Sequence, residues 1–286
     1  MSITVNTNLQ ALKIQNNLNK ATDRMNTSME RMSSGSRINS AKDDAAGLSV
    51  SIKMSADISG SKIASDNVAI GANLLGTTEG NLNVILSNVQ RIRDLAGQAA
   101  NGTYSAADLT AIAAEATARA AEIDRLAGAA TFNSKTLFGD TTALTGAAAV
   151  GITLQVGTAT SDTLLLDKST FKAATTTGLG MTTAIATAFA TSTAAGTFLG
   201  QCDTAITDLT GRLTNIGANQ NRLTSIASSL EVQQSNLTSA VSTIRDANVA
   251  QESAAYVSSQ ILQSASATLL VQANSAPQIA LTLIKG

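Results

Sequence analysis

Two adjacent carboxylates, Asp43 and Asp44, come nearest to a catalytic pair in this chain. Paired carboxylates can share general acid and general base work when their surroundings set their pKa values apart. The chain has no histidine and a single cysteine, Cys202, which excludes most nucleophile–base pairs and transition-metal sites. We therefore predict no enzyme, no metal and no cofactor. We expect Asp43 and Asp44 in the first turn of a helix, where the dipole favours carboxylates. We expect Cys202 to be a small buried hydrophobic residue.

The composition also argues against two classes of partner. The 286 residues carry a formal net charge of −1, which gives no electrostatic attraction for nucleic acid or an anionic membrane. No side chain from Ser253 to Ile284 is charged, but serine, threonine, asparagine and glutamine recur there. Because a bilayer helix needs about 20 mostly apolar residues, we do not interpret this stretch as a membrane span. We predict neither nucleic acid nor membrane as a partner.

Three helices are predicted in the first half of the chain, where apolar residues recur at steps of three and four. The first begins near Asn8 and ends at Gly35. The second has Ser40 as its N-cap, with an acidic residue three positions on, and covers Ala41–Ala100. Its glycines permit a neighbouring helix to approach closely. The third begins near Ser105.

The middle of the chain changes its period, and the last third returns to helix. Alternating residues over 152–156 and a run over 163–166 predict one or two β-hairpins. The last long helix begins near Thr197 and is interrupted near Asp246. A final helix follows, and Pro277 marks its predicted end. The fold class is therefore mainly α, a long antiparallel bundle or coiled coil that pairs N- and C-terminal segments, with a small β-hairpin region between them.

Apolar stripes of this length are not stable in water on single helices, so they must pack on each other, on copies of the chain, or on both. This makes the chain an assembly protein. The residues that we predict to form the assembly stripes are Leu18, Met25, Met32, Leu82, Ile85, Val89, Ile92, Leu223, Leu230, Leu237, Val241, Ile244, Leu262 and Leu269.

Specific segments at both ends resemble the bacterial flagellins. They include RMSSGSRINSAKDDAAG at 31–47, QRIRDLA at 90–96, EIDR at 122–125, GANQNRL at 217–223, QILQ at 260–263 and QAN at 272–274. The resemblance implies a secreted structural subunit of the extracellular flagellar filament, which serves motility, in a short form that lacks large outer domains. The implied partners are copies of the chain, the flagellar export apparatus and a chaperone, and the hook-associated and cap proteins. The alternative is a hook–filament junction protein with the same terminal helices.

The resemblance also divides the chain and names candidate sites. The implied parts are an N-terminal inner-tube helix at 1–40, outer-tube helical segments at 41–140 and 199–245, a central segment at 141–198 and a C-terminal inner-tube helix at 246–286. Carried over from the segment bound by the flagellin-sensing Toll-like receptor, Arg91, Leu95 and Glu115 are candidate receptor contacts. Candidate O-glycosylation sites in the Ser/Thr-rich middle are Thr158, Thr160, Ser161, Thr175 and Thr176.

Overall fold

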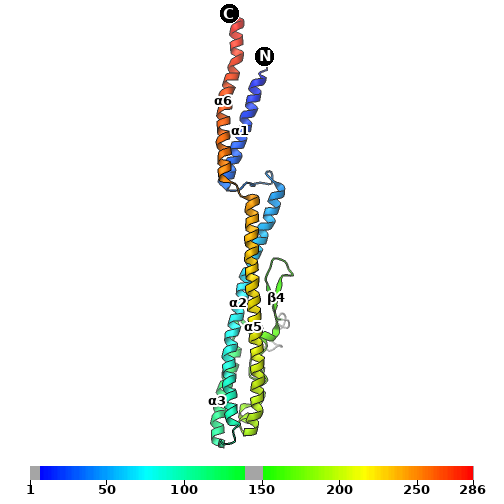
Figure 1. The fold of residues 1–286 in the computed structure, drawn as a ribbon, viewed down its shortest axis with the longest axis vertical. Helices are drawn as coiled ribbons and strands as arrows, with labels where there is room; N and C mark the ends of the chain where they lie inside the picture. Colours follow the sequence, from blue (N-terminus) through cyan, green and yellow to red (C-terminus); the bar gives the residue numbers. More distant parts are fainter. Residues whose placement is uncertain (1–6, 139–150, 286) are drawn as a thin grey trace. The chain divides into compact units, whose positions relative to one another are not determined.

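The computed structural model describes residues 7–138 and 151–285 (Figure 1). Two compact units share the chain: Met1–Ile58 with Ser235–Gly286, and Ser59–Gln234. The helices are α1 (Leu9–Ser34), α2 (Ala45–Ala99), α3 (Ala106–Ala129), α4 (Ile185–Ala188), α5 (Ser192–Arg245) and α6 (Val249–Lys285), with a 3-10 turn at Lys168–Phe171. The strands are β1 (Thr131–Phe132), β2 (Lys135–Thr136), β3 (Ile152–Gln155) and β4 (Thr163–Leu166).

In the first unit, α1 and α6 lie side by side and antiparallel (Figure 1). The shielded face of α1 carries residues at steps of three and four: Ile14, Leu18, Ala21, Met25, Ser28 and Met32. This is the apolar stripe expected from the sequence, and the predicted pairing of the two terminal segments is confirmed. The predicted interruption is confirmed too, because α5 ends at Arg245 and α6 begins at Val249.

The core of the second unit is formed by α2, α3 and α5. From α2, Leu82, Ile85, Val89 and Ile92 are completely buried in this core. Phe189 and Phe198 form an edge-to-face ring pair in this core, with their centroids 5.8 Å apart. Cys202 lies in the same core, fully buried, and burial raises the pKa of its thiol to about 12. The expectation of a buried cysteine is confirmed.

Two antiparallel hairpins confirm the predicted β region. β1 pairs with β2, and β3 pairs with β4 so that Ile152 lies opposite Leu166. Two glycines of α2, Gly60 and Gly71, make room for this region rather than for a neighbouring helix, while Gly76 and Gly80 face open space. The Leu154 side chain occupies the space that a Cβ on Gly71 would need, and a Cβ on Gly60 would lie 2.8 Å from Thr158 Cγ2. The β3–β4 hairpin therefore packs directly on the backbone of α2.

The predicted start of the second helix is wrong by four residues, and its N-cap is a different residue. Ser40 and Asp43 do exchange hydrogen bonds, since the Asp43 carboxylate accepts from Ser40 N at 3.0 Å and Ser40 Oγ at 2.9 Å. These bonds close a turn. The cap is Asp44, whose Oδ1 accepts from Gly47 N at 2.9 Å. A Ser-x-x-Asp pattern makes the same bonds in a turn as at a helix start, so it cannot fix the boundary.

Two further boundaries in the C-terminal half differ from expectation. α5 begins at Ser192, earlier than Thr197, because Thr191 Oγ1 accepts from Ala194 N at 3.2 Å and caps the helix there. The Ala/Thr-rich sequence around it hides this signal. α6 does not end at Pro277 but continues to Lys285. Proline removes one helical donor, and a side chain from α1 supplies the replacement, as described below.

Candidate assembly surface

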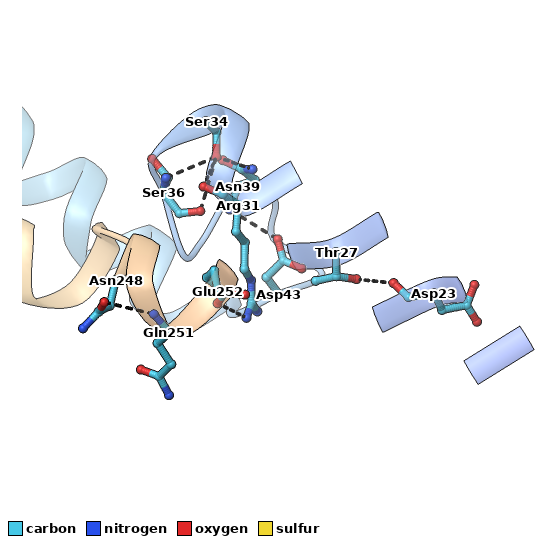
Figure 2. Close-up of polar contacts among 10 residues, drawn as sticks. All are labelled: Asp23, Thr27, Arg31, Ser34, Ser36, Asn39, Asp43, Asn248, Gln251 and Glu252. Atoms are coloured by element: carbon cyan, nitrogen blue, oxygen red, sulfur yellow. Dashed lines mark hydrogen bonds and ion pairs between the residues drawn. The ribbon is translucent and has the colours of Figure 1, made fainter. Parts of the chain in front are cut away.

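Polar side chains hold α1 and α6 together along their length. At the end where α1 stops and α6 begins, Arg31 Nη1 lies 3.2 Å from Glu252 Oε1, and Figure 2 shows the two side chains pointing toward one another. Gln263 Nε2 donates to Thr22 Oγ1 at 3.0 Å in the middle. At the far end, Asn8 Nδ2 donates to the Ala273 carbonyl at 2.8 Å. The pair is thus joined by bonds that are spread over some twenty residues of each helix.

Within residues 249–275, α6 leaves several large aliphatic residues exposed and shields several small or polar ones. Its residues shielded against α1 are mostly small or polar: Ser253, Tyr256, Ser259, Gln263, Ser266, Leu270 and Ala273. Its larger aliphatic residues are exposed in the single chain, including Ile261 at 62%, Leu269 at 56% and Val271 at 72%. Water favours the opposite arrangement, so this face is suited to burial against other protein.

α1 adds to the exposed apolar surface of the pair. Leu9 is 64% exposed and Leu12 is 55% exposed. A shallow hollow on α6 is lined mainly by apolar atoms of Val257, Ile261 and Leu262 beside three small residues. We call the exposed apolar residues of the two helices the terminal apolar face; they are Leu9, Leu12, Met29, Val249, Val257, Ile261, Leu262, Leu269 and Val271.

The connector between α1 and α2 is hydrogen-bonded to the connector between α5 and α6. The connector after α1 begins at Gly35, whose φ of +70° ends the helix in a left-handed conformation that glycine adopts freely. Arg37 N donates to Arg245 O at 2.6 Å, and Ala247 N donates to Gly35 O at 3.0 Å. The Arg37 guanidinium donates to the carbonyls of Thr243 and Ile244 at 3.1 and 2.6 Å, where α5 leaves carbonyls without helical donors.

Side chains within the first connector fix its shape (Figure 2). Ser34 Oγ accepts from Ser36 N at 3.1 Å and from Asn39 Nδ2 at 2.8 Å. The Ser40 hydroxyl, followed by the backbone amides of Ser40 and Asn39 and the charge of Lys42, holds the pKa of Asp43 below its usual value. Asp43 is therefore a carboxylate that closes a turn and Asp44 a helix cap, and neither is placed to exchange protons in a catalytic pair.

The predicted assembly stripes divide into three groups in the structure. Those that are buried inside the chain are Leu82, Ile85, Val89, Ile92, Leu223 and Leu230. Those that are half-buried are Leu18, Met25, Met32, Leu237, Val241 and Ile244. Only Leu262 and Leu269 are exposed, and both belong to the terminal apolar face. Leu262 and Leu269 can therefore contact another copy without any change in the chain. Their role in assembly stays a prediction.

The three candidate receptor contacts lie near one another, but only two present their side chains. Arg91 Nε donates to Glu115 Oε1 at 2.9 Å, and Nη2 donates to Oε2 at 3.2 Å, which makes a bidentate pair between α2 and α3. The hydrogen bonds and charge of this pair raise the pKa of Arg91 and lower that of Glu115. Leu95 is 2% exposed and faces the core.

The candidate glycosylation sites also fall into two groups. Thr158, Thr160 and Ser161 are exposed in the loop between β3 and β4. Thr175 and Thr176 are half-buried, and both have local structural partners. Thr175 Oγ1 accepts from Gly178 N at 3.1 Å, and Thr176 N donates to Asp124 Oδ1 at 2.7 Å. The first group is accessible to a modifying enzyme, whereas the second already contributes to the fold.

Sequence reasoning missed the polar residues that join the terminal segments. Asn8 was identifiable as an N-cap, because it precedes an apolar stripe, but its bond to α6 has no local signal. Arg37 and Glu252 likewise act on partners more than 200 positions away in the sequence. Among the described residues, no helix has the length and apolarity to cross a bilayer.

Comparison with known proteins gives matches at both ends of the chain. Residues 5–143 match the family model for the bacterial flagellin N-terminal helical region, and residues 199–284 match that for the bacterial flagellin C-terminal helical region. Flagellin FlaB1 of Treponema pallidum (strain Nichols) is 33% identical over 287 residues, which cover 98% of this chain and 99% of the relative. A flagellin of Salmonella typhimurium (strain LT2) is 42% identical over 208 residues, 72% of this chain but 40% of the relative. The chain thus spans well under half the length of the Salmonella relatives.

Two solved structures are similar as well. A putative flagellar hook-associated protein from Vibrio parahaemolyticus is 17% identical, with a TM-score of 0.59, covering 71% of this chain and all of that one. This similarity concerns the fold alone. Bacillus cereus flagellin is 30% identical over 58% of this chain and 88% of that one, with a TM-score of 0.49.

Proposed function

The chain belongs to the bacterial flagellin family and is a structural subunit of the flagellar filament; we propose that it assembles by burying its terminal apolar face against other copies of itself. The observation that carries this proposal is that α6 exposes large aliphatic residues such as Ile261 and Leu269, while it shields Ser259 and uses Gln263 to bind α1. A helix pair with this arrangement gains more from neighbours than from its own interior.

The contact between copies is head-to-tail in this proposal. We propose that the terminal apolar face of one copy packs on a different surface of the next, a heterologous contact, and heterologous contacts that do not close give helical polymers. The inner-tube assignment of residues 1–40 and 246–286 follows, because these segments contain both helices of the face. Residues 41–140 and 199–245 then form the outer tube, with 141–198 outside them.

The partners beyond the filament belong to this proposal too. Flagellin homologues form the extracellular flagellar filament, and we assign this chain the same location. Reaching it requires the flagellar export apparatus and a chaperone that shields the terminal apolar face before assembly. Hook-associated and cap proteins would contact the same face at the two ends of the filament. We assign the chain no catalytic role, since its family is structural.

Receptor recognition is the second part of the proposal. Arg91 and Glu115 form a bidentate charged pair on the surface, and Leu95 is buried on the same helix as Arg91. We expect purified monomer to activate a cell reporter for the flagellin-sensing Toll-like receptor, and Arg91→Ala to weaken the response. Lack of activation at saturating monomer would remove this part of the proposal and leave the filament role untouched.

O-glycosylation is the third part. Thr158, Thr160 and Ser161 are exposed and are the preferred sites, whereas modification of Thr175 or Thr176 would have to displace bonds within the fold. Intact-mass measurement of native filament tests this, and the mass of the bare polypeptide would reject it.

The alternative role as a hook–filament junction protein is supported by likeness of fold alone. Abundance separates the two roles, because a filament subunit dominates the protein sheared from the cell surface and a junction protein is scarce there. We expect this chain to be the main band of sheared fibres seen by electron microscopy.

Assembly itself is tested with purified full-length chain and short filament seeds. We expect seeded growth of helical tubes, promoted by salting-out, and we expect protease to trim both termini of the free monomer before the rest. A monomer whose termini resist protease and that never elongates seeds would contradict the proposal.

A further inference from the structure

Pro277 lies inside α6 and leaves one carbonyl of that helix without its usual donor. In an α-helix each amide N–H donates to the carbonyl four residues earlier, and proline has no N–H. Ala273 O is therefore the carbonyl that Pro277 cannot serve. A half-buried carbonyl without a partner is unfavourable, so the position needs a donor from elsewhere.

Asn8 provides that donor from the other end of the chain. Its Nδ2 donates to Ala273 O at 2.8 Å across 265 positions of sequence. The same amide caps its own helix, because Asn8 Oδ1 accepts from Ala11 N at 3.0 Å. One side chain thus fixes the start of α1 with its oxygen and binds the proline-freed site of α6 with its nitrogen.

The other contacts named between α1 and α6 lie closer to the connectors than the Asn8 bond does. The paired connectors hold one end of the helix pair, through Arg37 N with Arg245 O and Ala247 N with Gly35 O. Arg31 with Glu252, Met32 with Ser253, and Thr22 with Gln263 lie toward the connector end and the middle of the pair. The Asn8 bond is 21 positions beyond Glu252 on α6, about 30 Å at the α-helical rise.

We infer that Asn8 and Pro277 act as one device: the proline exposes the Ala273 carbonyl, and Asn8 binds it to set the register of the distal α1–α6 pair. In the filament this register decides how Leu9 and Leu12 align with the exposed aliphatic residues of α6. The inference rests on the proposed filament function, because the terminal apolar face is formed by both helices.

The test is a double-mutant cycle measured on purified filaments. Asn8→Asp keeps the oxygen that caps α1 but loses the Nδ2 donor, so it separates the two roles of the side chain. Pro277→Ala restores the helical donor to Ala273 O. Asn17→Asp is the matched control, since Asn17 is exposed on the same helix and the change adds the same charge. The readout is the temperature at which filaments dissociate, followed by light scattering.

We expect Asn8→Asp to lower the dissociation temperature by about 2–4 °C, the shift that accompanies loss of one net hydrogen bond in a chain of this size. In the Pro277→Ala background the same change should have less than half this effect, and Asn17→Asp should have little effect in either. Equal effects of Asn8→Asp in both backgrounds, or no effect in the native one, would overturn the inference.

A second measurement covers the case in which Pro277→Ala chains do not assemble. Hydrogen exchange of Asn8→Asp filaments should rise more for peptides covering 268–281 than for peptides covering 250–262, relative to Asn17→Asp filaments. A uniform rise, or none, would overturn the inference. Failure of the native chain to form filaments would instead reject the proposed function, so the two failures are distinct.

Discussion

Truncation of the terminal apolar face should raise the monomer concentration needed for filament growth without changing the stability of the free chain. Ile261 and Leu269 are suited to this test, because they are 62% and 56% exposed in the single chain and lie eight positions apart on α6. Each change to alanine removes three side-chain carbons whose burial is completed only by a neighbouring copy. Neither change opens a cavity inside the chain.

The size of the effect follows from the exposed fractions. At about 0.8 kcal/mol per buried carbon, scaled by the exposed fraction, the loss is about 1.5 kcal/mol for Ile261→Ala and about 1.3 kcal/mol for Leu269→Ala. The better helix propensity of alanine offsets a few tenths of a kcal/mol at each site. The critical concentration should rise about fivefold to tenfold for each variant. The sites are about 12 Å apart, so the effects should add to about 40-fold in the double variant.

The assay is seeded growth followed by sedimentation, with the residual monomer measured in the supernatant. Leu165→Ala is the matched control, because Leu165 is 45% exposed on β4, which belongs to the second compact unit. The urea midpoints of all variants should equal that of the native chain. The reasoning fails if the α6 variants elongate seeds at the native critical concentration, or if Leu165→Ala raises it as much as they do.

Three further predictions concern single side chains. Arg212 is 2% exposed and donates to the Lys172 carbonyl at 2.7 Å and to the Asp208 carboxylate. Because Asp208 is 38% exposed and can be solvated once Arg212 is removed, Arg212→Ala should destabilise the monomer by about 1.5–3 kcal/mol in urea unfolding, and a loss below about 0.5 kcal/mol would contradict this role. Arg37→Ala should speed proteolysis at the paired connectors of assembled filaments, since its bonds to two α5 carbonyls are lost; an unchanged cleavage rate would show that the backbone pairing suffices. Hydrogen bonding and charge from Arg91 depress the pKa of Glu115 below its usual 4.5, so its contribution to stability is present above that pH and is lost as pH falls through the folded value. Unfolding measured below about pH 4.5 should therefore depend less on pH in Glu115→Gln than in the native chain, and parallel curves would refute the linkage.

The fold was largely predictable because its strongest signals are periodic. The stripe on α1 and the alternation over β3 and β4 each matched the observed face or strand, since one buried face imposes one period. Boundaries were less predictable. The Ser40–Asp43 pattern closes a turn rather than capping α2, and the proline in α6 is tolerated because a residue in α1 compensates for it. Both outcomes depend on contacts that short sequence windows do not contain.

The candidate surface was harder to predict than the fold, for a related reason. Hydrophobic spacing identifies which residues of a helix avoid water, but not which neighbour covers them. On α2 the stripe that includes Leu82 and Ile85 is covered by the same chain. On α6 the predicted residues Leu262 and Leu269 are exposed, while Ser259, which a hydropathy argument would assign to the outside, is 5% exposed.

The exposed aliphatic residues of α6 affect how the terminal helices become ordered. Over residues 249–275 the α6 side of the α1–α6 interface is mostly small or polar, with Tyr256 and Leu270 as larger residues, and it gives specificity through single hydrogen bonds. Over residues 249–275 most of the large aliphatic residues of α6 are left for neighbours, so pairing within the chain and packing between chains stabilise the same two helices. Ordering of α1 against α6 and addition of a subunit to the filament are therefore coupled: each lowers the conformational entropy cost of the other. A charge-poor α6 fits this coupling, since no ionised side chain between Ser253 and Ile284 has to lose its water when the helix is buried.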